Sequence, residues 1–132
     1  MSSYIFIAIG SALGGIARFW CAEWAATSFD DTFPWGTMLV NIIGSFLIGF
    51  FATLTGPDGR VLVRQEHRQF VMIGLCGGFT TFSSFSLQTL TLAQSGNWAH
   101  AGANVVLSVS LCLFSVWLGH MVAAALNQLK GA

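Results

Sequence analysis

The thirteen residues from Gly74 to Ser86, GLCGGFTTFSSFS, decide how this chain folds. They lie inside a hydrophobic segment, yet they contain three glycines, two threonines and three serines. Lipid offers no hydrogen bonds to such groups, so the stretch must face other helices or a water-filled cavity. Phe79, Phe82 and Phe85 recur every three residues and therefore share one helical face. We expect an internal, functional segment here rather than a lipid-facing one.

Composition places the whole chain in a membrane. Of its 132 residues, 55% are hydrophobic and only 8% are charged, and the mean hydropathy is +0.72. A soluble domain usually carries about 25% charged residues. The formal net charge is zero, which gives no support to a nucleic-acid partner. We therefore predict a single transmembrane domain over residues 1–132, with the lipid bilayer as its surroundings.

Four windows are long enough to cross that bilayer. A spanning helix needs about 20 mostly apolar residues, and the windows run over about residues 4–26, 35–54, 70–93 and 98–126. The predicted fold class is all-α, with four transmembrane helices. The N-terminus lacks the basic region of a signal peptide, so we expect the first window to remain in the mature protein.

The first window contains close-packing residues and one charge. Gly10 and Gly14 stand four apart, a spacing that lets membrane helices approach closely. Arg18 is costly inside a membrane unless it snorkels or finds a partner. It is either an interfacial anchor or an electropositive element at the vestibule of an anion pathway.

Two later windows carry polar residues on one face. Asn41 lies one turn after Thr37, and its amide needs a hydrogen-bond partner in a membrane. It is either a link between helices or a ligand for a substrate. In the fourth window Asn104, Ser108 and Cys112 are each four residues apart, so they form one polar line.

The interior chemistry suits a small anion. No carboxylate falls well inside the windows, and no H-E-x-x-H, P-loop or dinucleotide motif occurs, so we predict that the protein is not an enzyme. What remains is a set of neutral hydrogen-bond donors: Asn41, Thr80, Thr81, Ser83, Ser84, Ser86, Asn104 and Ser108. Such donors replace the water of a small, hard anion. Phenyl rings have positive edges, so Phe82 and Phe85 could contact the same ion.

The glycine pair suggests a second ion. If the helix unwinds near Gly77 and Gly78, its freed carbonyls face the centre of the bundle. Broken membrane helices use such carbonyls to coordinate sodium. Without a carboxylate for coupling, a cation held there would be permanent and structural.

The residues that carry this chemistry also resemble a known family. The pattern Gly77-Gly78-x-Thr80-Thr81-Phe82-Ser83-x-Phe85-Ser86 is similar to the signature of the Fluc (CrcB) fluoride channels. Gly14 and Arg18 in the first window and Gly36-Thr37-x-x-x-Asn41 in the second extend the resemblance over essentially the whole chain.

The resemblance implies an antiparallel, dual-topology homodimer in a bacterial inner membrane. It implies two pores through which fluoride leaves the cytoplasm passively, which lowers its toxicity. It also implies a central, structural Na⁺ at the backbone carbonyls of Gly77 and Thr80. The pore residues that it implies are a phenyl pair, an amide, a polar track and nearby hydroxyls: Phe82 and Phe85; Asn41; Asn104, Ser108 and Cys112; Thr81, Ser83 and Ser84.

Some features depart from the family pattern. Gln88 stands where the family often has Glu, and Cys112 and Val116 replace track members that are often Ser or Thr. With four spans, one side of the membrane receives most of the basic residues: Arg60, Arg64, Arg68 and Lys130. By the positive-inside rule this bias favours one orientation, whereas the family resemblance favours two.

Two other functions compete with the fluoride channel. A small four-helix exporter of organic cations would need a membrane-embedded carboxylate for coupling, and none lies between Tyr4 and Arg18. A structural subunit of a larger complex would use its polar third helix to contact a partner and would move no ion alone.

Overall fold

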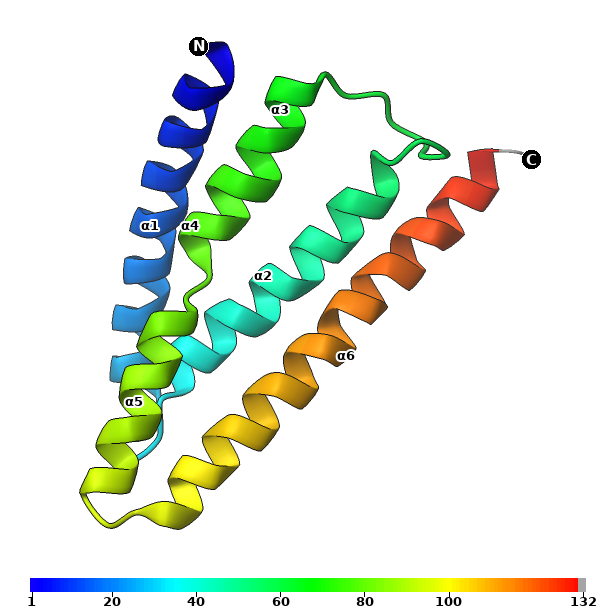
Figure 1. Ribbon diagram of the computed structural model, residues 1–132. Coiled ribbons are helices and arrows are strands. Elements are labelled where there is room, and N and C mark those ends of the chain that lie inside the picture. The colour runs from blue at the N-terminus through cyan, green and yellow to red at the C-terminus, as the bar shows by residue number, and fades with distance from the viewer. Residues whose placement is uncertain (131–132) are drawn as a thin grey trace.

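The computed structural model describes residues 1–130, which contain helices and no strand. Residues 131 and 132 of the predicted domain lie outside the described residues. The elements in chain order are α1 (Ser2–Ser28), α2 (Trp35–Leu54), α3 (Gln65–Gln69), the π-helix η1 (Phe70–Cys76), α4 (Gly77–Phe79), α5 (Phe82–Gln94) and α6 (Trp98–Lys130) (Figure 1).

Four helical segments in this range are long and apolar enough to cross a membrane: Ser2–Ser28, Trp35–Leu54, Gln65–Gln94 and Trp98–Leu129. They confirm the prediction of an all-α chain with four spans. The third segment begins five residues earlier than expected, at Gln65 rather than Phe70. That first turn is polar, so hydropathy alone does not detect it.

The helices pack as two groups. α2 runs along α6, and α1 lies against η1 and α4 (Figure 1). Glycines make both contacts close. Gly10 and Gly74 meet backbone to backbone, so that a Cβ on Gly74 would lie 2.9 Å from the Cα of Gly10. Gly49 and Gly119 serve the α2–α6 contact in the same way, against the carbonyls of Val116 and Phe46. The predicted packing role of Gly10 and Gly14 is confirmed, since both are buried.

The third span is broken in its middle. Thr80 and Thr81 have extended backbones, with φ and ψ of −87° and 159° and of −154° and 112°. The predicted break is therefore present, but it lies after the glycines rather than at them. Gly77 is helical, with φ −65° and ψ −36°. Gly78 is needed for contact with α1, because a Cβ there would lie 2.6 Å from the Ser11 carbonyl oxygen.

Most of each span faces outward. Only 11–22% of the residues in the four apolar windows are buried within the chain. Large apolar side chains such as Ile16, Leu90 and Val106 are more than half exposed. The described residues therefore leave wide apolar surfaces for lipid or another protein to cover.

Candidate functional site

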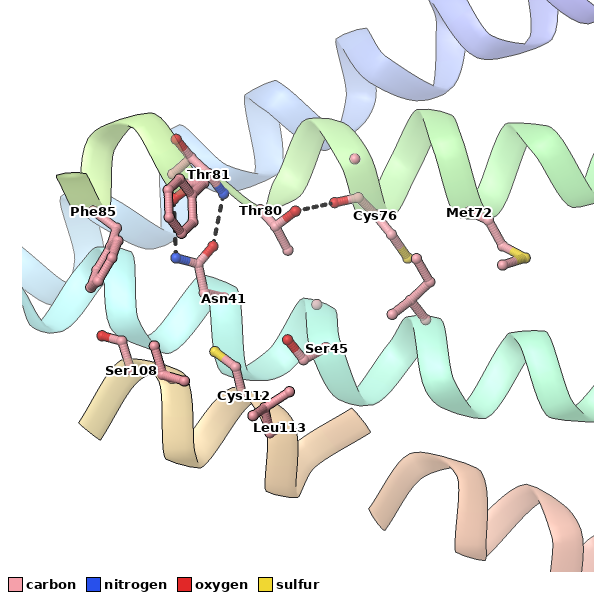
Figure 2. Close-up of a pocket in the computed structure, with 15 residues that line it drawn as sticks. Asn41, Ser45, Met72, Cys76, Thr80, Thr81, Phe85, Ser108, Cys112 and Leu113 are labelled. Atoms are coloured by element: carbon pink, nitrogen blue, oxygen red, sulfur yellow. Dashed lines mark hydrogen bonds between the residues drawn. The ribbon is translucent and has the colours of Figure 1, made fainter. Parts of the chain in front are cut away.

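Asn41 of α2 holds the break in the third span. Its Nδ2 donates to the Thr81 carbonyl oxygen at 3.1 Å, and its Oδ1 accepts from the Thr81 N–H at 2.7 Å (Figure 2). One amide thus satisfies both polar groups of a residue that has left the helix. Asn41 does link two helices, which was one of its two predicted roles. Its second Nδ2 hydrogen is used by neither of these bonds.

The Thr81 side chain starts the next helix. Its Oγ1 accepts from the Ser84 N–H at 3.2 Å and lies 3.1 Å from the Ser84 Oγ. This is an N-cap, which satisfies a backbone donor that the first helical turn leaves free. Ser83 Oγ lies 3.3 Å from the same oxygen. Ser83 and Ser84 are thus next to the cap.

These side-chain bonds free two carbonyls. In an unbroken helix the Gly77 carbonyl would accept from the Thr81 N–H, and the Thr80 carbonyl from the Ser84 N–H. Here Asn41 and the Thr81 hydroxyl take those two donors. Thr80 Oγ1 itself donates to the Cys76 carbonyl at 2.9 Å. The carbonyls of Gly77 and Thr80 thus lose their regular helical partners, at the two positions predicted to bind a cation.

A cavity of about 360 Å³ opens beside the break. Eight predicted site residues line it: Asn41, Gly77, Thr80, Thr81, Phe82, Phe85, Ser108 and Cys112. No lining side chain carries a carboxylate, an ammonium or a guanidinium group. Figure 2 shows Asn41, Thr81 and Phe85 at one end of the cavity, with Ser108 and Cys112 of α6 facing them.

The two phenylalanines differ in exposure. Their ring centroids lie 5.3 Å apart with an interplanar angle of 51°. Phe85 is 9% exposed, whereas Phe82 is 77% exposed although it lines the cavity. The cavity therefore has one wall whose outer face is uncovered within a single copy of the chain.

The predicted polar line of α6 is only partly at the cavity. Ser108 and Cys112 line it, but Asn104 does not. Asn104 is 1% exposed and donates to Thr89 Oγ1 at 2.9 Å, while its Oδ1 accepts from Ser108 Oγ at 3.2 Å. Asn104 thus supports Ser108 from behind. Sequence reasoning missed Thr89, although it stands four residues after Phe85 on the same helix and donates to the Phe85 carbonyl.

Four predicted residues do not line the cavity: Arg18, Ser83, Ser84 and Asn104. Arg18 is half-buried on α1, and it forms no ion pair within residues 1–130. Gly44 and Ser45 of α2 also line the cavity. Gly44 lies against the Thr80 methyl group, where a Cβ would collide with it. Val116, which follows Cys112 by four residues on α6, packs against Gly49 and does not line the cavity.

Comparison with known proteins identifies relatives along the whole length. Residues 5–120 match the family profile described as CrcB-like protein, Camphor Resistance (CrcB). The chain is 62% identical over 129 residues to a protein of Methylocella silvestris, with 98% of each chain covered. It is 59% identical over 132 residues to one of Opitutus terrae, covering all of both chains. Both relatives are named fluoride-specific ion channel FluC.

Proposed function

The chain belongs to the CrcB family, and we propose that it is a fluoride-selective channel that lets fluoride leave the cytoplasm. The observation that carries this proposal is the cavity beside Thr81. None of its lining side chains is an acidic or basic group, and Asn41 on its wall keeps one Nδ2 hydrogen that the two bonds to Thr81 do not use. A bare fluoride ion loses a large hydration energy, and closely spaced hydrogen-bond donors are needed to replace it.

The donors that serve this role come from α2, the break and α6. The unused Nδ2 hydrogen of Asn41 belongs to a residue that lines the cavity. The hydroxyls of Thr81 and Ser108 line it too, and they would donate to the ion after turning away from Ser84 Oγ and Asn104 Oδ1. The rings of Phe82 and Phe85 add positive edges without adding an acceptor. A channel wall without charge binds an anion weakly enough to release it, which conduction requires. Cys112 completes this side as a weak donor.

Ser83, Ser84 and Asn104 act behind the wall in this proposal. Ser83 and Ser84 stand at the cap of α5 and so keep Phe82 and Phe85 in register. Asn104 accepts a hydrogen bond from the Ser108 hydroxyl and so holds its oxygen at the cavity wall. Arg18 stands outside the cavity, where its positive charge would attract anions to a vestibule rather than bind them in the pore.

A second copy of the chain completes the site. Phe82 is exposed, and few residues of each span are buried within one copy of the chain. A second copy could cover these surfaces. We propose an antiparallel homodimer with two equivalent pores, one for each copy of the cavity. A two-fold arrangement suits this, because the same surface then contacts itself.

The freed carbonyls of Gly77 and Thr80 fit a structural Na⁺. Both oxygens have lost the helical N–H that would otherwise neutralise them. Sodium is a hard cation that binds carbonyl oxygens in broken membrane helices. A second copy would bring the same pair of carbonyls to the centre. The bound cation would supply a fixed positive charge, which offsets the cost of holding an anion nearby.

Passive conduction suffices for export in this account. In a bacterial inner membrane the negative interior potential favours the outward movement of an anion by about 2.3 kcal/mol per 100 mV. No carboxylate lines the cavity, so none stands beside the ion to couple that movement to protons. Export would keep cytoplasmic fluoride, and therefore its toxicity, low.

Ion flux from liposomes tests this function against its alternatives. Purified protein should release trapped fluoride and retain chloride. Proton flux driven by an organic cation would instead support a multidrug-type exporter. Absence of any flux from a folded preparation would favour a structural subunit of a larger complex.

A further inference from the structure

A second cavity lies beside the loop that joins α2 to α3. Its volume is about 840 Å³, and it is placed between the end of α2 and the start of the third span. Its walls include Thr55, Leu62, Arg64, Arg68, Met72 and Ile73. It shares only Met72 with the cavity beside Thr81, so it is a separate site.

The walls of this second cavity carry two guanidinium groups and no carboxylate. Arg68 is held in place, since its Nε donates to Thr55 Oγ1 at 3.2 Å and an Nη to the Ala52 carbonyl at 3.5 Å. Arg64 is far more exposed: it lies 3.6 Å from Glu66, but its side chain is 79% exposed, so that ion pair is weak. Arginine offers five N–H donors, and most of those on Arg64 and Arg68 have no partner here.

The depth of the cavity matches the boundary between headgroups and hydrocarbon. The 20 residues of α2 span about 30 Å, which is the thickness of the hydrocarbon core. Thr55 caps the end of that helix and bonds Arg68, so a bilayer whose core matches α2 would place Arg68 near the lipid phosphates. On the hydrocarbon side Ile73 is 54% exposed, and Leu62 in the loop is 89% exposed.

We propose that this second cavity binds the headgroup of an anionic phospholipid. The phosphate would accept hydrogen bonds from Arg64 and Arg68, because arginine matches phosphate oxygens in both charge and geometry. The acyl chains would lie on Met72 and Ile73. A free phosphate ion offers the same oxygens but would leave the exposed apolar residues uncovered. The site does not depend on fluoride passage, so either proposal can fail alone.

Lipid retention by the purified full-length protein tests the proposal. Native mass spectrometry in detergent would measure binding of phosphatidylglycerol and of phosphatidylcholine with the same acyl chains. Detergent removes the membrane surface potential, so a basic residue counts only if it touches the lipid. We expect clear preference for phosphatidylglycerol. An exposed charge pair contributes up to about 1 kcal/mol, so Arg64→Gln should weaken binding about fivefold, and the double variant with Arg68→Gln about 25-fold.

Arg60→Gln is the matched control. Arg60 lies in the same loop, carries the same charge and does not line the cavity. Its backbone N–H, rather than its side chain, bonds Asn127. Binding should therefore change less than twofold. If the double variant does not fold because the bonds from Arg68 to Thr55 and Ala52 are lost, the exposed Arg64 variant still decides. Equal binding of both lipids, an equal loss in Arg60→Gln and Arg64→Gln, or displacement of the lipid by millimolar inorganic phosphate would each overturn the proposal.

Discussion

The amide of Asn41 forms two hydrogen bonds with the backbone of Thr81, one donated and one accepted, across 40 residues of sequence. This pairing replaces the helical bonds that Thr81 would otherwise make. It explains why a membrane helix can open at this point without leaving the Thr81 N–H or carbonyl unsatisfied. Asn41 also lines the cavity, and neither bond uses its second Nδ2 hydrogen.

Replacing Asn41 with Asp should abolish fluoride transport. The carboxylate can still accept from the Thr81 N–H but cannot donate to its carbonyl, and it places a negative charge beside the anion path. The lost bond should also destabilise the fold by about 1–3 kcal/mol. Fluoride efflux and the thermal unfolding temperature would be measured together.

Asn127→Asp is the control for that variant. Asn127 has the same pattern, since its Nδ2 donates to the Thr53 carbonyl at 3.0 Å and its Oδ1 accepts from the Arg60 N–H at 2.7 Å. It lines neither cavity. This variant should lose stability but keep its flux. Wild-type flux in Asn41→Asp would mean that Asn41 serves packing alone.

Replacing either Phe82 or Phe85 with Ile should lower fluoride flux in a dimer that still folds. Isoleucine fills similar space but has no positive ring edge to offer an anion. Phe85 is buried, so its replacement should cost about 1–3 kcal/mol of stability, and that of exposed Phe82 much less. Phe114, which is 55% exposed on α6 and lines neither cavity, provides the control substitution. Unchanged flux in both Phe82→Ile and Phe85→Ile would remove the phenyl pair from the mechanism.

Gly44→Ala should disturb the break in the third span. The added methyl would overlap the Thr80 methyl group and lie 3.4 Å from the Phe79 ring. Overpacking of this kind costs about 1–3 kcal/mol. Gly15→Ala is the matched control, because no atom lies within 4 Å of a Cβ there. A thermal shift assay should show a lower unfolding temperature for Gly44→Ala alone. Equal behaviour of the two variants would indicate that the contact with Thr80 is unimportant.

Dual topology can be tested with a tag on the C-terminus. We expect two populations in the membrane, one accessible from each side, because an antiparallel dimer needs both. The basic loop residues Arg60, Arg64 and Arg68 work against this by the positive-inside rule. A single accessible population would rule out the antiparallel dimer, whatever the flux.

The sequence predicted the architecture well, because hydropathy alone defines spans of this length. The position of the break was less predictable. Glycines suggested unwinding at Gly77 and Gly78, but Gly78 serves close contact with Ser11 of α1, which only the packed structure reveals. A threonine followed by a helix is a cap signal, and Thr81 could have been recognised in this way.

Contacts between residues on different helices were also not predictable from the sequence. The four-residue spacing of Asn104, Ser108 and Cys112 predicts one polar surface, since each is one turn from the next. Asn104 instead turns toward Thr89 of α5, a choice set by how the two helices face each other. The π-helical segment Phe70–Cys76 also had no signal in the sequence. It lies where Gly10 and Gly14 bring α1 against its backbone.

Efflux of fluoride and chloride from the same liposomes is the most direct test of a fluoride-selective channel. The purified protein would be reconstituted into liposomes loaded with both potassium fluoride and potassium chloride. Valinomycin would carry the compensating K⁺. Ion-selective electrodes would then follow both anions in one experiment. We expect rapid release of fluoride while chloride stays inside. Equal release of the two anions, or no fluoride release from protein that is folded by circular dichroism, would contradict it.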